Sequence, residues 1–431
     1  GYLHKGPAEK RDFLFRYTYK VCSARIQPGK PYRCGWVCSY FLFFATMSRY
    51  YSHINSAQKI IEAYTGAEPF ASHLKKQFAA NKKFGSKDRK QITQLCYCYF
   101  RLGKSLPDVS IEEKLLAGLF LSSRTSNELL QHLKPEWNDV IETNIEKKME
   151  LLNGAVDASS IFPFTNELSE GIDVNEFAFS HLQQPDLFLR IRPGRKETVL
   201  HQLKAADVSF QLIGENTVAL PNATKIEEVI MLNKDAVVQD YSSQRVGELL
   251  ENLKSEIENK KWNVWDCCAA SGGKSIMAKD VLGEIDLTVS DVRESILINL
   301  KKRFQEAGIK NYKSFVRDLS LHSPLTTHHS AFDLIIADVP CSGSGTWGRT
   351  PEQLSFFQTS AIETYSALQR KIISNAITQL KPNGYFLYIT CSVFQKENED
   401  NVAWMQEELK LQLVKQEVIK GYAVKADTMF A

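Results

Sequence analysis

The chain has 431 residues, of which 43% are hydrophobic and 24% are charged, and its formal net charge is +3. This length allows two or three domains with a sizeable core, and the composition is ordinary for a globular protein. With so small a net charge, the total charge gives no support for a nucleic-acid partner. Such a partner can be inferred only from where the charged residues lie along the chain.

The first 46 residues are unusual. They are basic and then reach an apolar run from Trp36 to Thr46, which resembles a signal peptide. The run is too short for a membrane span, and no clear cleavage site follows it. We interpret residues 1–46 as a non-native or over-extended start with Met47 as the initiator, keep a signal peptide as the alternative, and expect no membrane association.

Residues 47–185 are predicted to be helical. Apolar residues recur at helical spacing in two segments. These are Ile54, Ile60, Ile61 and Tyr64 in the first, and Leu115, Leu116, Leu119 and Phe120 in the second.

The densest positive stretch of the chain lies between these two segments. From Lys75 to Lys104 there are nine Lys or Arg residues and one acid, Asp88. The stretch is either a solvated helix face or a surface that contacts RNA phosphates. The candidate RNA contacts are Lys82, Lys83, Lys87, Arg89 and Lys90.

Residues 186–224 are expected to form a small α/β module. Leu187–Arg192 alternates like a strand, a short helix follows from Glu197 to Ala206, and two further strand-like segments are Ser209–Ile213 and Thr217–Leu220. Arg190, Arg192, Arg195 and Lys196 would give the module a basic edge. Arg190 and Arg192 are further candidate RNA contacts.

From about residue 225 to residue 431, strands alternate with helices. Most of the strands are short apolar runs of the buried parallel type. This order predicts an open, doubly wound α/β sheet, in which ligands bind outside the carboxyl ends of the strands. The predicted strands are Asn263–Cys267, Asp286–Ser290, Lys313–Val316, Phe332–Ala337 and Tyr385–Thr390.

The first of these strands runs into a loop of small residues and glycines. A turn of this kind lets a ligand approach the backbone closely. The spacing of its glycines fits neither a P-loop nor the dinucleotide pattern G-x-G-x-x-G. The candidate cofactor-binding residues are Cys268, Ala269, Ala270, Ser271, Gly272, Gly273 and Lys274.

The next two strands each end in an acid. Asp291, about 20 residues after the glycine turn, is placed to bind ribose hydroxyls, and Asp318 is placed to meet an adenine edge. A single Asp after a strand is usually a helix cap or a turn former. Three successive strand ends with suitable groups favour a nucleoside site.

Nine cysteines are scattered along the chain, without the regular spacing of a disulfide framework. We therefore expect a reduced, cytoplasmic compartment. Cys34 and Cys38 could form half of a metal site, but no matching Cys/His pair follows, so we expect no metal.

Two cysteines differ from the others in their placement. Cys341 follows the fourth strand, after Asp338, and Cys391 follows the fifth, so the two should lie close together beside the nucleoside site. A lone cysteine is usually an inert, buried residue, and that interpretation suits Cys96, Cys98 and Cys267. A thiolate that adds to carbon 6 of cytosine makes carbon 5 able to take a methyl group from a sulfonium. Asp338 could stabilise the adduct by hydrogen bonding or proton donation.

These residues resemble the Fmu/Sun/Nop2 family of S-adenosylmethionine-dependent RNA cytosine-5 methyltransferases, over roughly residues 186–431. The segment from Val238 to Gln244 is similar to the start of that family's catalytic domain, and Cys268 to Lys274 is similar to its cofactor loop. Its two cysteine motifs resemble Asp338-Val339-Pro340-Cys341-Ser342-Gly343 and Thr390-Cys391-Ser392, the latter followed by Glu397-Asn398-Glu399.

The resemblance implies a Rossmann-like class I methyltransferase sheet preceded by an all-α, NusB-like RNA-binding domain and the small module. It implies that Cys391 is the nucleophile, that Cys341 assists product release, and that Asp338 holds the cytosine with Lys274 near it. Asp291, Asp318 and Asp338 would join the loop in binding S-adenosylmethionine. The family's bacterial members imply 16S ribosomal RNA as the substrate, and we expect a monomer.

The chain departs from the family in two places. Ser271 stands where the family usually has proline, which we expect to loosen the loop without removing a required contact. The chain also stops at Ala431, within the sequence segment that begins the last strand in the family. We therefore expect an incomplete sheet edge.

Four alternatives remain. A transfer RNA could be the substrate, or the chain could be a non-catalytic assembly factor, although no cysteine or acid is lost. A methyltransferase of base amino groups needs no cysteine, and a DNA cytosine methyltransferase places its nucleophile in a Pro-Cys turn alone. Cys391 and the helical domain favour the RNA enzyme over both.

Overall fold

The computed structural model describes the backbone of residues 35–256, 261–321 and 331–431, and the side chains of 49–255, 261–321 and 331–431. The chain divides into two compact units, residues 1–50 and 51–431, and the second unit carries every candidate site residue. Most of the predicted extension, residues 1–46, lies outside the described residues. Its last part belongs to the backbone of helix α1, Gly35–Glu62, which runs across the predicted boundary at Met47. In the described part of the chain we find no helix that is both long and apolar enough to cross a bilayer.

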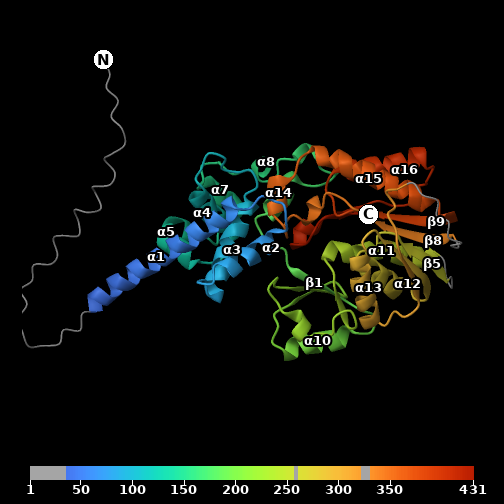
Figure 1. Cartoon of the computed structure of the whole chain (residues 1–431), viewed down its shortest axis with the longest axis horizontal. Helices are drawn as coiled ribbons and strands as arrows, with labels where there is room; N and C mark the ends of the chain where they lie inside the picture. Colours follow the sequence, from blue (N-terminus) through green and yellow to red (C-terminus); the bar gives the residue numbers. More distant parts are fainter. Residues whose placement is uncertain (1–34, 257–260, 322–330) are drawn as a thin grey trace, which may run out of the picture. The chain divides into compact units, whose positions relative to one another are not determined.

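The helical prediction for the N-terminal region is confirmed (Figure 1). The apolar residues that predicted its helices are buried, among them Ile54 and Leu115, each fully. The Ser110 hydroxyl accepts a hydrogen bond from the backbone N–H of Glu113 and so caps the start of α4. The helices after α1 are α2 (Phe70–Ala80), α3 (Ser86–Arg101), α4 (Ile111–Ser122), α5 (Glu128–Leu133), α6 (Pro135–Asn138), α7 (Ile145–Glu150), α8 (Ala158–Ile161) and α9 (Val174–Ser180).

The small α/β module is an antiparallel sheet of four strands in the order β2-β3-β1-β4, covered by helix α10 (Lys196–Ala205). Its strands are β1 (Leu187–Ile191), β2 (Gln211–Ile213), β3 (Thr217–Leu220) and β4 (Ala236–Val238). Strand β4 was not predicted, and it lies beyond residue 224, where the predicted module ends. The strand has only three residues, and its place in the sheet comes from pairing with β1.

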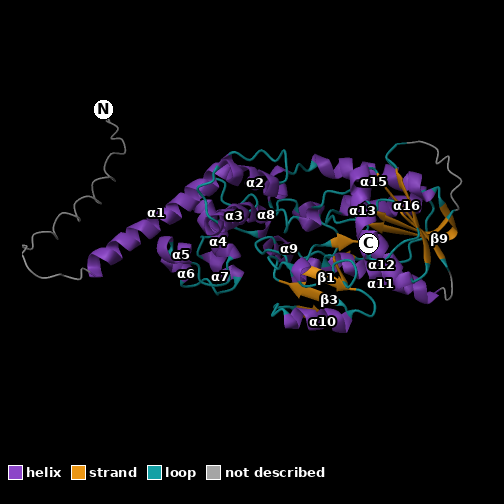
Figure 2. Ribbon diagram, turned by 60° about the horizontal axis from the view of Figure 1, so that its bottom comes forward, coloured by secondary structure: helices purple, strands orange, loops and turns teal. Residues whose placement is uncertain are grey.

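The C-terminal region contains the predicted parallel sheet (Figure 2). Its strand order is β7-β6-β5-β8-β9. Four of its strands lie within one residue of their predicted bounds. The fifth, β9, begins five residues earlier than predicted, because its pairing with β8 shifts register between Phe332 and Leu334. The strands are β5 (Trp262–Asp266), β6 (Ile285–Asp291), β7 (Tyr312–Val316), β8 (Phe332–Asp338) and β9 (Leu380–Ile389).

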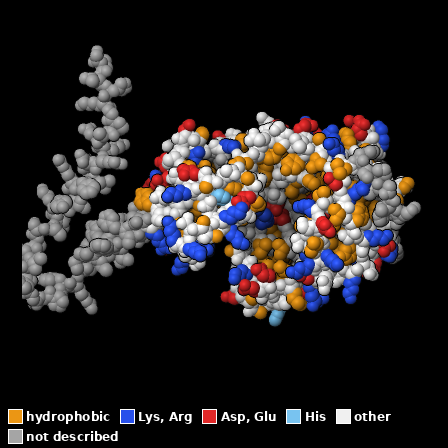
Figure 3. Space-filling view, viewed as in Figure 1, with side chains coloured by type: hydrophobic (Ala, Val, Ile, Leu, Met, Phe, Trp, Pro, Cys, Tyr) orange, Lys and Arg blue, Asp and Glu red, His pale blue; other side chains and the backbone are white. Residues whose placement is uncertain are grey.

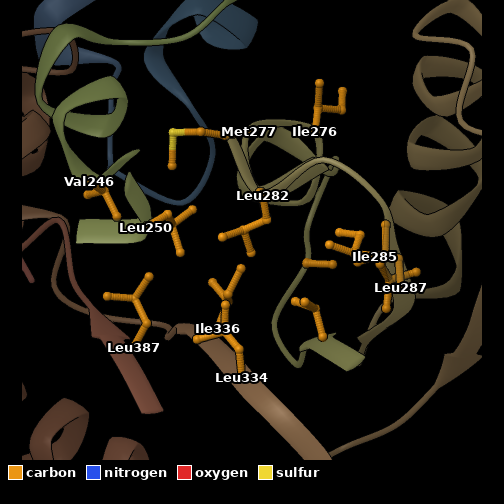
Figure 4. Packing of buried hydrophobic residues seen from close by; sticks show 14 of the residues in the cluster. Val246, Leu250, Ile276, Met277, Leu282, Ile285, Leu287, Leu334, Ile336 and Leu387 are labelled. Carbon is orange, nitrogen blue, oxygen red and sulfur yellow. The ribbon is translucent and has the colours of Figure 1, made fainter. Parts of the chain in front are cut away.

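Helices cover both faces of this sheet (Figure 1). On one face, α11 (Tyr241–Glu256), α12 (Gly273–Leu282) and α13 (Glu294–Glu306) pack their apolar residues against the strands. Figure 4 shows Leu250 of α11 and Leu282 of α12 facing Leu387 and Ile336 of the sheet. On the other face lie α15 (Ser360–Ile377) and α16 (Glu399–Glu408). The two layers fix the strand ends that carry the site.

The last segment of the chain returns to this sheet. Strand β11 (Met429–Phe430) pairs with β10 (Val418–Ile419), and Phe430 exchanges two backbone hydrogen bonds with Thr390, each 3.0 Å long. Thr390 is the residue before Cys391. The end of β9 is therefore held from both sides, by β8 and by β11.

Candidate active site

The two cysteines of interest meet at the carboxyl ends of β8 and β9. The Sγ atoms of Cys341 and Cys391 are 3.2 Å apart, and both thiols are free and partly exposed. The hydrogen bond with the Cys391 sulfur, together with burial, raises the pKa of the Cys341 thiol well above its usual value. Cys341 therefore keeps its proton near neutral pH and can donate its S–H to the Cys391 sulfur.

The buried carboxylate of Glu397 connects the two loops that carry the cysteines. Glu397 is fully buried and accepts hydrogen bonds from the backbone N–H of Ser342 at 2.9 Å and from the Ser392 hydroxyl at 2.8 Å. The Gln369 side chain donates a further hydrogen bond to Glu397, at 2.9 Å. Sequence reasoning noted Glu397 only as part of a motif and missed this role, because the contact joins residues 55 positions apart.

Lys274 and Asp338 form an ion pair beside the cysteines, with Lys274 Nζ 3.0 Å from Asp338 Oδ2. Lys274 also donates a hydrogen bond to the Ser243 hydroxyl at 2.7 Å, a contact that the sequence did not reveal. The lysine side chain is 8% exposed, whereas that of Asp338 is 31% exposed. Asp338 is therefore oriented by Lys274 and remains accessible to a ligand.

The loop between β5 and α12 has the shape of a ligand cradle. Ala270 and Gly272 have left-handed φ angles of 46° and 84°, which turn the backbone sharply before the helix begins. The Asp291 carboxylate, at the end of β6, accepts a hydrogen bond from the backbone N–H of Ala270 at 3.0 Å. The predicted loop and the predicted ribose-binding acid are thus brought together. This strand-loop-helix turn with an acid at the next strand end suits a nucleoside.

Asp318 is placed differently from this group. It follows β7, and its carboxylate accepts hydrogen bonds from the backbone N–H and the hydroxyl of Ser320, at 2.8 and 2.6 Å. The described contacts of Asp318 thus form a local turn, which is the ordinary role of such an acid. An adenine contact for Asp318 stays a prediction.

Ser271 of the loop is bonded to helix α13. Its hydroxyl accepts a hydrogen bond from Arg303 Nη1 at 2.7 Å. We expected this serine to loosen the loop, and the structure instead gives its hydroxyl a partner.

The predicted basic patch lies on the turn before α3 and on the first turns of α3, where all five candidate residues are exposed. Figure 3 shows Lys and Arg side chains on this helical part of the molecule. Arg101, which contributed to the predicted positive stretch, is buried and donates hydrogen bonds to the backbone oxygens of His181 and Gly348, at 2.7 and 3.0 Å. It joins the helical region to the loop that follows Cys341, and does not belong to the surface patch.

The predicted basic edge of the small module is wrong for two of its arginines. Arg190 and Arg192 both point to Asp280 of helix α12, with nitrogen–oxygen distances of 2.7 Å, and the three side chains are at most 14% exposed. A buried carboxylate needs such partners, since an unpaired buried charge is costly. These arginines fasten the module to helix α12 of the parallel-sheet region and are not placed to contact RNA. Among the described residues, no three His, Cys, Asp or Glu side chains form a group that could hold a metal ion.

The C-terminal part of the chain is similar to known proteins. Residues 253–429 match the family model described as 16S rRNA methyltransferase RsmB/F. The matched segment belongs to the RsmB/F family. This is a family of S-adenosylmethionine-dependent RNA cytosine-5 methyltransferases, so the resemblance found in the sequence is confirmed.

Relatives of the RsmB/F segment include two kinds of enzyme. The ribosomal RNA small subunit methyltransferase B of Pasteurella multocida is 27% identical over 230 residues, which are 52% of this chain and 50% of the relative. The human tRNA (cytosine(72)-C(5))-methyltransferase NSUN6 is 31% identical over 174 residues, 36% of each chain. The chain spans half or less of the length of these relatives.

Solved structures support the fold of the RsmB/F segment and of the regions before it. The crystal structure of PH0851 has a TM-score of 0.62 and 17% identity, and the match covers 88% of this chain and 97% of that one. NSun6 from Pyrococcus horikoshii, solved with the S-adenosylmethionine analogue SFG, has a TM-score of 0.50 and 14% identity over 62% of this chain and 95% of that one. At these identities the likeness shows the fold alone.

Proposed function

We propose that the chain methylates carbon 5 of a cytosine in RNA. The observation that carries this proposal is the pair of thiols 3.2 Å apart, contributed by two neighbouring strand ends beside the Lys274–Asp338 ion pair. A methyl transfer to an amino group needs no thiol, whereas an attack on carbon 6 of cytosine requires a strong nucleophile.

In the proposed reaction, Cys391 attacks. Its thiolate forms a bond to carbon 6, which makes carbon 5 electron-rich enough to accept a methyl group. S-adenosylmethionine, when bound along Cys268–Lys274 with Asp291, supplies that methyl group from its sulfonium. Carbon 5 then loses its proton to water, the electron pair of that C–H bond restores the double bond between carbons 5 and 6, and the bond between carbon 6 and the Cys391 sulfur breaks with its electron pair left on the sulfur.

Cys341 assists the last step. Its thiol keeps its proton because the neighbouring sulfur and burial raise its pKa, and it lies at hydrogen-bond distance from the departing sulfur. Donation of that proton to Cys391 makes the sulfur a better leaving group. Asp338, held by Lys274, accepts a hydrogen bond from the cytosine amino group and orients the ring. The base must be unpaired or flipped out of its stack to reach these groups.

The proposed substrate is 16S ribosomal RNA, which the family model and the bacterial relatives favour. Transfer RNA is the second candidate, because the NSUN6 relatives are at least as similar in sequence. The exposed patch of Lys82, Lys83, Lys87, Arg89 and Lys90 is the proposed phosphate contact. We propose a monomer that acts in the cytoplasm.

The test is methyl transfer from labelled S-adenosylmethionine to three RNAs: 16S ribosomal RNA, total transfer RNA and a cytosine-free transcript. Bisulfite sequencing of the labelled RNA then locates the modified base. We expect label in 16S ribosomal RNA at carbon 5 of a cytosine. Label in transfer RNA alone would overturn the ribosomal assignment and keep the chemistry. Binding of RNA without label in any of the three would indicate a non-catalytic assembly factor.

A further inference from the structure

Ser271, at the centre of the cofactor loop, is hydrogen-bonded to the side chain of Arg303. Arg303 of helix α13 donates from Nη1 to both acceptors of Ser271, to the backbone oxygen at 3.1 Å and to the hydroxyl at 2.7 Å. These are charge-assisted hydrogen bonds, which are stronger and more directional than neutral ones. The residue between the two left-handed positions of the loop is thereby fixed to a helix.

The loop conformation requires such support. Ala270 has a φ angle of 46°, a left-handed conformation that a residue with a Cβ adopts only at an energetic cost. Conformations of this kind persist only where their surroundings impose them. Helix α13 also packs closely against Gly272, the residue after Ser271. A Cβ at Gly272 would lie 2.6 Å from the ring of Phe304 in this helix. The same helix thus supports the turn at two consecutive positions.

Arg303 is itself oriented by the small module. Its Nε donates a hydrogen bond to the Asn233 side-chain oxygen at 3.0 Å. Asn233 is buried, its amide nitrogen donates to Glu306 at 2.7 Å, and its backbone oxygen accepts a hydrogen bond from Arg192 at 2.9 Å. A continuous set of hydrogen bonds therefore runs from the small module through Asn233 and Arg303 to the cofactor loop.

We propose that Arg303 is a positioning residue for S-adenosylmethionine: it fixes the turn from Ala270 to Gly272 through Ser271, and Asn233 holds it in place. The inference rests on the proposed function, because it takes the Cys268–Lys274 loop as the cofactor site. It gives the small module a part in cofactor binding. Arg303 touches neither the cysteines nor Asp338 in any described contact, so it acts on the affinity for the cofactor and not on the chemical step.

The test is the dissociation constant of S-adenosylmethionine, measured by calorimetry on the full chain. Arg303→Met is expected to raise this constant by roughly tenfold or more, and Ser271→Ala, which removes only the hydroxyl bond, by about threefold. Because Arg303→Met already removes both bonds, the double variant is expected to bind no more weakly than Arg303→Met alone. Arg303→Lys keeps a donor and a charge and is expected to lie between Met and the wild type.

Two further measurements separate positioning from general damage to the fold. In Arg303→Met, KM for the cofactor is expected to rise, while the affinity for RNA is expected to stay unchanged. Lys302→Met, an exposed residue beside Arg303 on the same helix, is the matched control and is expected to change neither constant. Ser271→Ala keeps the test decisive where Arg303→Met lowers the melting temperature.

Wild-type affinity for S-adenosylmethionine in both Arg303→Met and Ser271→Ala would overturn this inference and leave the proposed function intact. A wild-type chain that does not bind S-adenosylmethionine would instead overturn the proposed function. Additive losses in the double variant would also count against the inference, because they would show that the two residues act separately.

Discussion

Glu397 accepts a hydrogen bond from the backbone N–H of Ser342 at 2.9 Å, and Ser342 directly follows Cys341 in the chain. The other oxygen of the same carboxylate accepts a hydrogen bond from Ser392, which directly follows Cys391. One buried side chain thus sets the distance between two loops that the sequence separates by 50 residues. The burial of Glu397 raises the pKa of its carboxyl, so its hydrogen bonds must offset the cost of burial.

Glu397→Gln is expected to lower kcat by roughly ten- to a hundredfold, because a small displacement of a reacting group is costly. The amide nitrogen of glutamine cannot accept one of the two hydrogen bonds that now join the loops. KM for S-adenosylmethionine is expected to stay within twofold of the wild type, roughly the noise expected for an untouched site. Steady-state kinetics with Glu407→Gln, an exposed change on the following helix, as the control would detect this split. An unchanged kcat would contradict the bridging role.

Cys391→Ala is expected to abolish methylation, because no other described thiol replaces the one that attacks carbon 6. The affinity for S-adenosylmethionine is expected to be retained, since Cys391 lies outside the Cys268–Lys274 loop. Label transfer and calorimetry on the same preparation test both parts. Turnover near that of the wild type would refute the assignment of Cys391 as the nucleophile.

Cys341→Ala is expected to trap a covalent complex of protein and RNA. The Cys391 sulfur can still attack, but no thiol 3.2 Å away returns a proton to it when it departs. A denaturing gel with labelled RNA should show a shifted band that is absent in the Cys341→Ala, Cys391→Ala double variant. If no band shifts, Cys341 has no role in release.

Asp266 makes stability depend on pH. Burial at the end of β5 raises its pKa from 3.8 to about 7, and the Ser275 hydroxyl donates a hydrogen bond to it at 2.6 Å. Because the pKa is raised on folding, the unfolded chain releases this proton at lower pH than the folded one. The stability is therefore fully present below pH 3.8 and is lost as the pH rises to about 7.

Asp266→Asn removes this titration. Relative to the wild type, the variant is expected to gain about 2 to 3 kcal/mol in the free energy of unfolding between pH 5 and pH 8. Urea unfolding of both proteins at the two pH values measures the difference. A difference that does not change with pH would show that the Asp266 carboxyl has an ordinary pKa.

The exposed basic patch is expected to contribute to RNA affinity through phosphate contacts. Changing Lys82, Lys83 and Lys87 together to Ala should reduce the magnitude of the slope of log affinity against log salt concentration by about 2. Each phosphate contact that is lost means that fewer counterions are released when RNA binds. The matched control removes three exposed lysines of the α13 region, Lys301, Lys302 and Lys310, with the same loss of charge. Equal slopes for the two triple variants would assign the effect to net charge and not to the patch.

Much of the fold could be predicted from the sequence because its signals are local. Buried parallel strands are short apolar runs, and the helices of the N-terminal region repeat apolar residues at helical spacing. Strand β4 was not predicted, because three residues are too few to show the alternation of apolar and polar residues that marks a strand. Its position depends on pairing with β1. Arg190 and Arg192 were misassigned for a related reason: a charged side chain in a strand gives no sign of which face it lies on or of the acid that it meets.

The sequence by itself determined which residues could perform the chemistry: two cysteines after strand ends, an acid before the first, and a glycine loop with a lysine. Residue type and order along the chain are enough for this, because parallel strands bring their carboxyl ends to one edge. Only the tertiary structure decided how these groups act. The proton on Cys341, the Glu397 bridge and the Arg303 support of Ser271 all depend on contacts and burial between distant segments, and the packing of the helices and the sheet creates both.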